Sequence, residues 1–416
     1  MNKISIFIIA VFATALFSCT EDLGKTTVEY EKAEAIYGDL DALRSTALVS
    51  PSRTITDPGK VYVSENLLLI GEEGEGIHVF DNSDPESPQE LYFINIPQNR
   101  EFYVTNNKIY AESLYDVVKI DISNIQAPVL ESRVENAFAN PRENSNGESL
   151  IGFTYTQVSE TLDRSSNIFN LINGNDPIFF DFQQQLIPRS SVPASFAGSS
   201  GSSIGTVNRI AHAKDHLYII SNSNIYTFQD GDSFDKVSEN QIGWNMETIY
   251  PQEESLFIGT RNSMEILSIV NAANPAWVSN FSHATSCDPV LPAGNTAYVT
   301  LRSGTECDGN IDALTVIDIQ DLTIPRSKQE IDMESPYGMT IINGQLYVGE
   351  GENGLKIFNI LDDDTLELVD HDKSIQAYDV IPHPTKSDII LVASPSGFGQ
   401  YQITSTSREL LSWISA

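Results

Sequence analysis

The stretch GIHVFDNSDPESP, residues 76–88, decides the fold because its pattern returns along the chain at a nearly constant interval. Related stretches are DVVKIDISNIQAP at 116–128, MEILSIV at 264–270, LTVIDIQDLTIP at 314–325 and GLKIFNI at 354–360. Weaker copies are NIYTFQ at 224–229 and FGQYQI at 398–403. We call the position of Asp81 the marker; the markers fall at 81, 121, 229, 268, 318, 359 and 402. A period near 40 with several short strands per unit is typical of propeller blades.

A tight hairpin precedes each marker. Asn106-Asn107 and Asn343-Gly344 each separate two short apolar runs, and these residue pairs tolerate the positive φ angles of two-residue hairpin turns. A polar turn, often with proline, follows each marker and leads into another strand-like run. Two strands, the marker strand and a fourth strand make one blade. The sequence therefore predicts an all-β protein, a β-propeller over residues 57–416.

The long gap after Asp121 decides the number of blades. Residues 136–205 contain no recognisable inner hairpin, and their last part, 190–205, is rich in serine and glycine. We interpret 136–205 as an insertion, which leaves seven blades; eight blades with one degenerate copy is the alternative. The ring would close by packing of the first blade against the last, or by a small strand exchange.

The first residues are typical of an export signal. One cation, Lys3, precedes an apolar run over residues 4–17, which is too short to span a bilayer. We therefore predict a signal peptide at 1–18 and a tether at 19–56. Within the tether, residues 29–48 have apolar side chains at roughly helical spacing and predict a short amphipathic helix.

Two resemblances extend this interpretation. The quoted units resemble the LVIVD-repeat family of bacterial β-propeller proteins, whose unit reads G-L-x-I-x-D-[IV]-S-D-P-x-x-P; Ser268, Asn359 and Gln402 depart from it. That resemblance implies a propeller in a surface or periplasmic setting and carries no agreed activity.

Leu16-Phe17-Ser18-Cys19 resembles the lipobox of bacterial lipoproteins, which implies that Cys19 carries acyl chains such as palmitate and anchors the protein to a membrane. Thr20-Glu21-Asp22 resembles the acidic export tag of Bacteroidetes surface lipoproteins. Together they imply an outer membrane lipoprotein whose body faces the periplasm or the cell surface.

Charge narrows the class of partner. The chain has 24 Lys+Arg against 57 Asp+Glu, a formal net charge of −33. Such a protein repels nucleic acid and anionic lipid headgroups, so the membrane is reached through the lipid anchor only. We expect a protein of the envelope or cell surface as partner.

Residues four or five positions before each inner turn form the candidate binding site. They are Lys60, Glu101, Arg209, Glu247, Asp288, Gly338 and Asp379. If each hairpin begins with the innermost strand, these residues surround one mouth of the central channel. They either form a network of ion pairs at the rim or collect Ca²⁺, a cation or a sugar-like ligand.

The remaining chemistry is sparse. Cys287 and Cys307 flank one predicted hairpin, and in an exported protein we expect them to form a disulfide. The chain has no G-x-S-x-G, H-E-x-x-H or G-x-x-x-x-G-K motif. The leading hypothesis is a membrane-anchored, non-enzymatic interaction module without a cofactor. The alternatives are a propeller that binds Ca²⁺ or a small ligand at the acidic mouth, and an enzyme that acts on glycans or lactones through two mouth carboxylates.

Overall fold

The computed structural model describes residues 24–171, 177–181, 185–187, 209–221, 223–243, 246–283, 289–303, 311–404 and 407–416. Cys19, Cys287, Asp288 and Cys307 lie outside these ranges, so lipidation, the disulfide and the role of Asp288 stay predictions. The described chain is all-β apart from two short helices, α1 (Leu40–Arg44) and α2 (Asn167–Leu171). Neither described helix has the length and apolar character needed to cross a bilayer.

Seven sheets follow one another along the described chain, each built from consecutive antiparallel strands. Sheet 1 contains β3 (Pro58–Val63), β4 (Leu67–Glu72), β5 (Gly76–Asp81) and β6 (Gln89–Asn95), with β2 (Val49–Ser50) added beside β6. Sheet 2 contains β7 (Phe102–Thr105), β8 (Lys108–Ser113), β9 (Asp116–Asp121) and β10 (Val129–Val134). Sheet 3 contains β13 (Ile210–Ala213), β14 (His216–Ile220), β15 (Asn224–Asp230) and β16 (Phe234–Gln241). Sheet 4 contains β17 (Met246–Gln252), β18 (Ser255–Thr260), β19 (Ser263–Ser268) and β20 (Ala276–Ser282).

The last three sheets have the same order. Sheet 5 contains β21 (Val290–Ala293), β22 (Thr296–Leu301), β23 (Ala313–Asp318) and β24 (Arg326–Asp332). Sheet 6 contains β25 (Met339–Ile342), β26 (Gln345–Gly349), β27 (Leu355–Ile360) and β28 (Leu366–Asp372). Sheet 7 contains β29 (Asp379–Pro382), β30 (Ile389–Ser394), β31 (Gly397–Ile403) and β32 (Arg408–Ser415). The repeat found in the sequence is therefore a four-stranded antiparallel sheet.

The marker aspartate of the repeat closes the turn that ends the third strand of a sheet. The Asp81 side chain accepts a hydrogen bond from the backbone N–H of Ser83 at 3.0 Å, and Asp121 accepts one from Ser123 at 2.7 Å. A carboxylate that bonds the backbone two residues later closes a turn and ends the strand. The hairpin prediction is also confirmed, because Asn106 and Asn107 have φ values of 50° and 56°.

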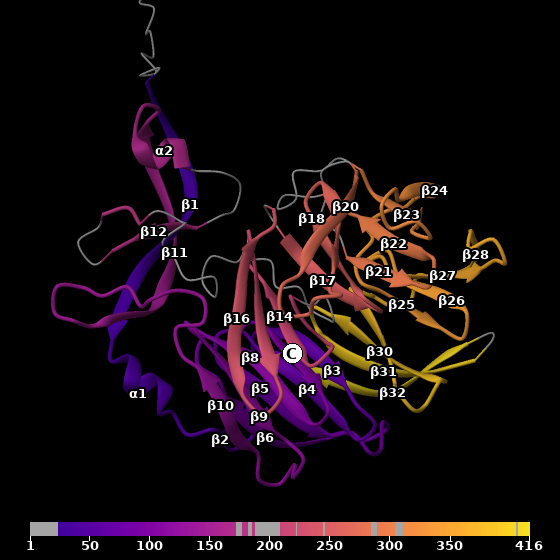
Figure 1. Ribbon diagram of the computed structural model, residues 1–416, viewed down its shortest axis with the longest axis horizontal. Helices are drawn as coiled ribbons and strands as arrows, with labels where there is room; N and C mark the ends of the chain where they lie inside the picture. The colour runs from indigo at the N-terminus through magenta and orange to yellow at the C-terminus, as the bar shows by residue number, and fades with distance from the viewer. Residues whose placement is uncertain are drawn as a thin grey trace, which may run out of the picture.

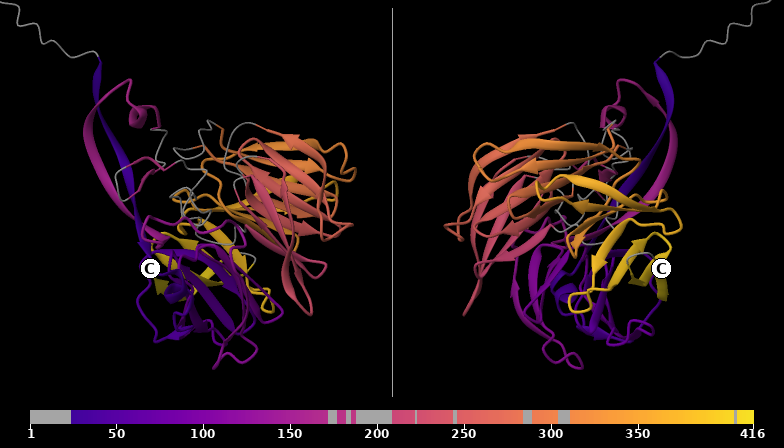
Figure 2. Two further views of the ribbon diagram at one scale, coloured as in Figure 1. Left: turned by 60° about the vertical axis from the view of Figure 1, so that its left-hand side comes forward. Right: turned by 90° about the vertical axis from the view of Figure 1, so that its right-hand side faces the viewer.

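Apolar clusters join each sheet to the next. One cluster combines Ile77 and Val79 of sheet 1 with Val104 and Ile109 of sheet 2, and equivalent clusters join the following sheets. A further cluster joins sheet 7 to sheet 1, and Figures 1 and 2 place the C-terminus beside the first sheets. The architecture is thus all-β and propeller-like, with its first and last sheets in contact as expected.

Hydrogen bonds reinforce that joint between the first and last sheets. The side-chain amides of Asn82 and Gln400 exchange two hydrogen bonds of 3.0 and 2.7 Å, and both residues are buried. Gln400 and Ser412 also donate to the carbonyl of Pro85. Packing and polar contacts thus join the two sheets.

The tether differs from the prediction. Instead of a helix over 29–48, residues Lys25–Gly38 form strand β1, and only Leu40–Arg44 are helical. β1 pairs along its whole length with β11 (Ser149–Asp163) and briefly with β12 (Ile178–Phe180). A short isolated helix is marginal in water, whereas this ladder satisfies the backbone and buries Tyr30 and Ala33.

The tether and the predicted insertion therefore form one three-stranded sheet, which we call the arm. Figures 1 and 2 show the arm standing away from the seven sheets, with α2 near its far end. Neither segment by itself contains the partner strand that determines its structure.

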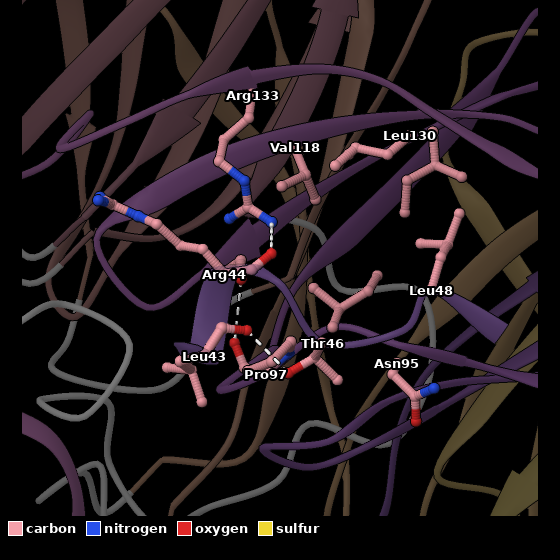
Figure 3. Close-up of a pocket in the computed structure, with 12 residues that line it drawn as sticks. Leu43, Arg44, Thr46, Leu48, Asn95, Pro97, Val118, Leu130 and Arg133 are labelled. Carbon is pink, nitrogen blue, oxygen red and sulfur yellow. Dashed lines mark hydrogen bonds between the residues drawn. The ribbon is translucent and has the colours of Figure 1, made fainter. Parts of the chain in front are cut away.

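Helix α1 joins the arm to the body. Asp116 is 1% exposed and receives hydrogen bonds from Arg44, from Arg133 and from the backbone of Asn136. A cavity of about 30 Å³ beneath α1, lined by residues such as Leu43, Leu48 and Arg133, has room for about one water molecule (Figure 3). We regard it as a packing gap rather than a ligand site.

Candidate functional site: the inner ring

The pairing register shows which residues of the first strands are equivalent. In sheet 2 the last pair before the turn is Thr105 with Lys108, and in sheet 4 it is Gln252 with Ser255. In every sheet, the first strand has a last paired residue before the turn. The position four residues before that residue is equivalent from sheet to sheet. These seven positions, which we call the inner ring, are Lys60, Glu101, Arg209, Thr248, Pro289, Gly338 and Asp379.

Five of the seven predicted mouth residues belong to this ring. Glu247 precedes the ring position by one residue, since pairing is regular from Thr248 to Gln252. Its carboxylate lies 3.5 Å from the Arg261 guanidinium. The sequence prediction allowed an offset of four or five residues before the turn, and the offset of five selected Glu247 in place of Thr248.

Lys60 and Glu101 form a buried, incomplete ion pair. The residues are 2% and 8% exposed, and the Lys60 ammonium lies 3.5 Å from Glu101 Oε2. Neither of these two atoms has a hydrogen-bond partner among the described residues. Burial lowers the pKa of Lys60, and the negative charges of Glu101 and Asp379 oppose that shift. The pair is held by charge at a distance rather than by a well-formed hydrogen bond.

Arg209 and Asp379 extend this charged group. The positive charge of Arg209 adds to the lowering of the Lys60 pKa, so the two cations are neighbours. Arg209 Nε is buried without a hydrogen-bond partner among the described residues. Asp379 is fully buried, and a Cβ at Gly338 would lie 2.0 Å from its carboxylate. Glycine at 338 is therefore required for Asp379 to occupy this place.

Two further carboxyl groups, which were not among the predicted site residues, adjoin the ring. Burial raises the pKa of Glu73 to about 7 and that of Glu112 also to about 7. Arg100 lies 3.7 Å from Glu73 and partly opposes both shifts, while the charge of Glu101 adds to them. Glu73 and Glu112 lie where the second strands of sheets 1 and 2 end. Their matching places in the repeat were therefore a sequence signal for them.

Three tyrosines follow the ring positions by two residues. Tyr62, Tyr103 and Tyr250 stand after Lys60, Glu101 and Thr248, and alternation along a strand places them on the same side as the ring. Burial raises the pKa of Tyr103, and the nearby Tyr62 and Tyr250 raise it further.

In sheet 3, which lies between sheets 2 and 4, the equivalent residue is the small Ala211. Tyr250 of sheet 4 nevertheless contributes to the raised pKa of Tyr103 in sheet 2. The recurring triplets KVY, EFY and TIY are the sequence signal for these tyrosines, which were not among the predicted site residues.

The inner ring and its neighbours bring together ammonium, guanidinium, carboxyl and phenol groups. Within the described ranges, no three His, Cys, Asp or Glu side chains gather closely enough to hold a metal ion. What the arrangement can do is supply hydrogen-bond donors, acceptors and aromatic surface at one place, as binding sites do.

Comparison with known proteins identifies the fold alone. No family model matches the chain, and no curated protein matches it. Among solved structures, a functionally unknown protein from Desulfotomaculum acetoxidans DSM 771 is similar, with a TM-score of 0.51 and 11% identity over 86% of this chain and 95% of that one. A chain of the Mitotic Checkpoint Complex is similar with a TM-score of 0.51 and 10% identity, covering 83% of this chain and 91% of that one. These likenesses support the propeller-like architecture.

Proposed function

We propose that the seven sheets are the blades of a seven-bladed β-propeller, similar to LVIVD-repeat proteins, that acts as a non-enzymatic interaction module anchored in the outer membrane through Cys19. The inner ring is the place where its partner docks. The observation that carries this proposal is the buried Lys60–Glu101 pair, whose facing atoms have no hydrogen-bond partner in the described ranges of the chain.

The hydrogen-bonding capacity of the buried Lys60–Glu101 pair is not fully used within the described part of the chain. A buried polar atom without a hydrogen bond costs about 1–3 kcal/mol, and more when it is charged. A fold under selection for stability alone would replace such a pair with apolar side chains. A partner that supplies donors and acceptors at the ring would recover part of this cost on binding.

The arm supports the anchoring part of the proposal. Lys25, where β1 begins, lies six residues after Cys19. The 14-residue ribbon of β1 with β11 extends over about 45 Å at the usual rise per residue. A lipid at Cys19 would therefore hold the body away from the membrane, where an envelope or surface protein can reach it.

Crosslinked purification of the tagged, acylated protein from its native envelope tests the proposal. We expect one stoichiometric partner protein with the wild type and its loss with the double variant Lys60→Met, Glu101→Gln. The matched control is Lys328→Ala, which removes an ion pair of 3.2 Å with Asp364; Lys328 lies on β24, at the opposite edge of sheet 5 from the strand that carries the ring position. Absence of any partner, or equal capture by the double variant, would overturn the proposal.

The anchor is tested separately. Cys19→Ala should abolish labelling by radioactive palmitate and release the protein from the membrane fraction. Retention of the label by this variant would refute lipidation at Cys19.

A further inference from the structure

The arm has a strand edge whose backbone groups are not paired within the described part of the chain. β11 is an outermost strand there, because the strand order is β11-β1-β12. The Arg164 N–H donates to the Gly24 carbonyl at 2.8 Å, so these two residues form a hydrogen-bonded pair of the antiparallel ladder. Such pairs alternate along the ladder, so Gln157, Ser159 and Thr161 direct their N–H and C=O groups away from β1. Among the described residues, none of these outward groups has a hydrogen-bond partner.

The outer strands of the seven body sheets are protected in a way that β11 is not. In each of those sheets, the pairing of the third strand with the fourth contains a register shift. Such bulges twist an edge and hinder its pairing with another chain. From Phe153 to Asp163, β11 has no register shift, and residues 154–162 contain no Lys, Arg, Pro or Gly. This edge therefore remains competent for strand pairing.

One face of β11 is apolar. Val158 and Leu162 are half-buried and pack against the cluster formed by Tyr30 and Ile178. A strand added beside β11 would place alternate side chains next to Val158 and Leu162, since alternate residues share a face. Apolar residues at those positions would extend the cluster.

The other face is polar and acidic. Glu29 and Glu31 of β1 lie opposite Ser159 and Gln157, and therefore share their face. A strand added beside β11 would lie about 10 Å from β1, since neighbouring strands are about 4.8 Å apart, and long basic side chains would come closer to these carboxylates. The net charge of −33 also favours a cationic partner and opposes pairing with a second copy.

We propose that an extended segment of a partner protein, with alternating apolar and basic residues, adds to the arm as a strand along Gln157, Ser159 and Thr161. In such strand addition, main-chain hydrogen bonds supply affinity and alternate side chains supply specificity. β12 pairs with β1 only at Lys32–Glu34, so the added strand also turns the outer, two-stranded part of the arm into a three-stranded sheet, which is more stable.

This surface is separate from the inner ring and does not depend on the function proposed for it. The arm stands away from the seven sheets (Figure 2), so a strand can add to β11 without contact with the ring. The variant Lys60→Met, Glu101→Gln should therefore bind such a segment as the wild type does.

A fluorescence anisotropy titration of the full-length acylated protein in a neutral detergent tests the inference. The probe is a short labelled peptide in which valine alternates with lysine. We expect it to bind, and Ser159→Pro to lower its affinity about tenfold or more, because proline removes an outward N–H of the ladder. Proline is tolerated on an edge strand where the N–H faces solvent, so the pairing with β1 remains. Ser159→Ala is the matched control, because it keeps the N–H, and it should bind normally.

Two further measurements separate strand addition from general charge attraction and from unfolding. A peptide with proline in place of each valine keeps the charge but cannot pair, and it should not bind. In the wild type, the valine–lysine peptide should slow the hydrogen exchange of residues 156–163. Equal melting temperatures of the Ser159 variants exclude unfolding as the cause of lost binding.

Four results would overturn the inference: no binding of the valine–lysine peptide, equal binding by Ser159→Pro, equal binding of the proline peptide, or unchanged hydrogen exchange of residues 156–163. A dimer in sedimentation velocity that Ser159→Pro abolishes would also overturn it, because a second copy of this chain would then occupy the edge.

Discussion

Two buried ion pairs of this protein have opposite characters. Asp116 receives hydrogen bonds of 2.8 to 3.0 Å from Arg44, Arg133 and the Asn136 backbone. Lys60 and Glu101 lie 3.5 Å apart with both facing atoms unpaired among the described residues. Both pairs hold charges away from water, but only the first is saturated.

The saturated contacts of Asp116 attach the arm to the body, whereas the unsaturated Lys60–Glu101 pair lies where we propose that a partner is recognised. At Asp116 every interaction lies within the protein, and the pair fastens helix α1, and with it the arm, to sheet 2. At the inner ring, side-chain atoms of Lys60, Glu101 and Arg209 are buried without a hydrogen-bond partner among the described residues. Buried polar groups are normally satisfied, so the exceptions are where binding is to be sought.

Asp116→Ala should give the largest effect. It leaves Arg44 and Arg133, whose side chains are 13% and 16% exposed, without their carboxylate. We expect the free energy of unfolding to fall by about 3–5 kcal/mol, as for other broken buried pairs. Urea denaturation followed by circular dichroism measures this, and a fall below about 1 kcal/mol would show that the arm joint is not an essential contact.

Gln400→Ala should have the next largest effect. The variant leaves the side-chain amide of Asn82 without its partner and removes one of the two donors to the Pro85 carbonyl at the joint between sheets 7 and 1. We expect a loss of about 1–3 kcal/mol, the usual cost of unsatisfied buried groups. The exposed Gln402→Ala, two residues away on the same strand, is the control and should change little.

The carboxyl groups beside the ring should make stability depend on pH. Burial raises the pKa of Glu112 from its ordinary 4.5 to about 7, so its ionisation disfavours the folded state. Its contribution is therefore fully present below pH 4.5 and is lost as pH rises to about 7. Glu112→Gln, which cannot ionise, should lose less stability than the wild type between pH 5 and 7.5. Identical urea midpoints at both pH values in both proteins would contradict this.

Lys60→Met with Glu101→Gln should have the smallest effect on stability. Replacing both members of an unsaturated buried pair is often neutral or stabilising, so we expect a change within about 1 kcal/mol, or a gain. The same variant should abolish partner capture. A loss as large as that of Asp116→Ala would mean that both pairs are structural, and the contrast between them would disappear.

The repeat could be predicted from the sequence because the residues that form its turns interact with residues close to them in the chain. Asp81 and Asp121 close turns with backbone groups two residues away, and Asn106-Asn107 adopts its turn without help from other sheets. Lys60, Glu101 and Asp379 were found by counting back from such turns. Glu247 was misplaced because sequence spacing did not distinguish an offset of four residues before the turn from one of five, and the pairing register selects four.

The arm could not be predicted from the sequence because its strands pair with segments far away in the chain. Lys25–Gly38 contains good helix formers such as Glu31, Lys32 and Ala33, and local preference alone favours a helix. Its partner strand begins more than 100 residues later, at Ser149. The free energy of a ladder along the whole strand outweighs the modest local preference.

By itself, the sequence determined the period, the four-stranded unit, the turns and the acidic charge of this protein, because each depends on residues close together in the chain. Only the tertiary structure decided that the tether and the insertion share one sheet, that Asn82 meets Gln400, and that Lys60 and Glu101 are buried together. Those contacts depend on which distant segments pack together and on how deeply each side chain is buried, and no local pattern encodes either.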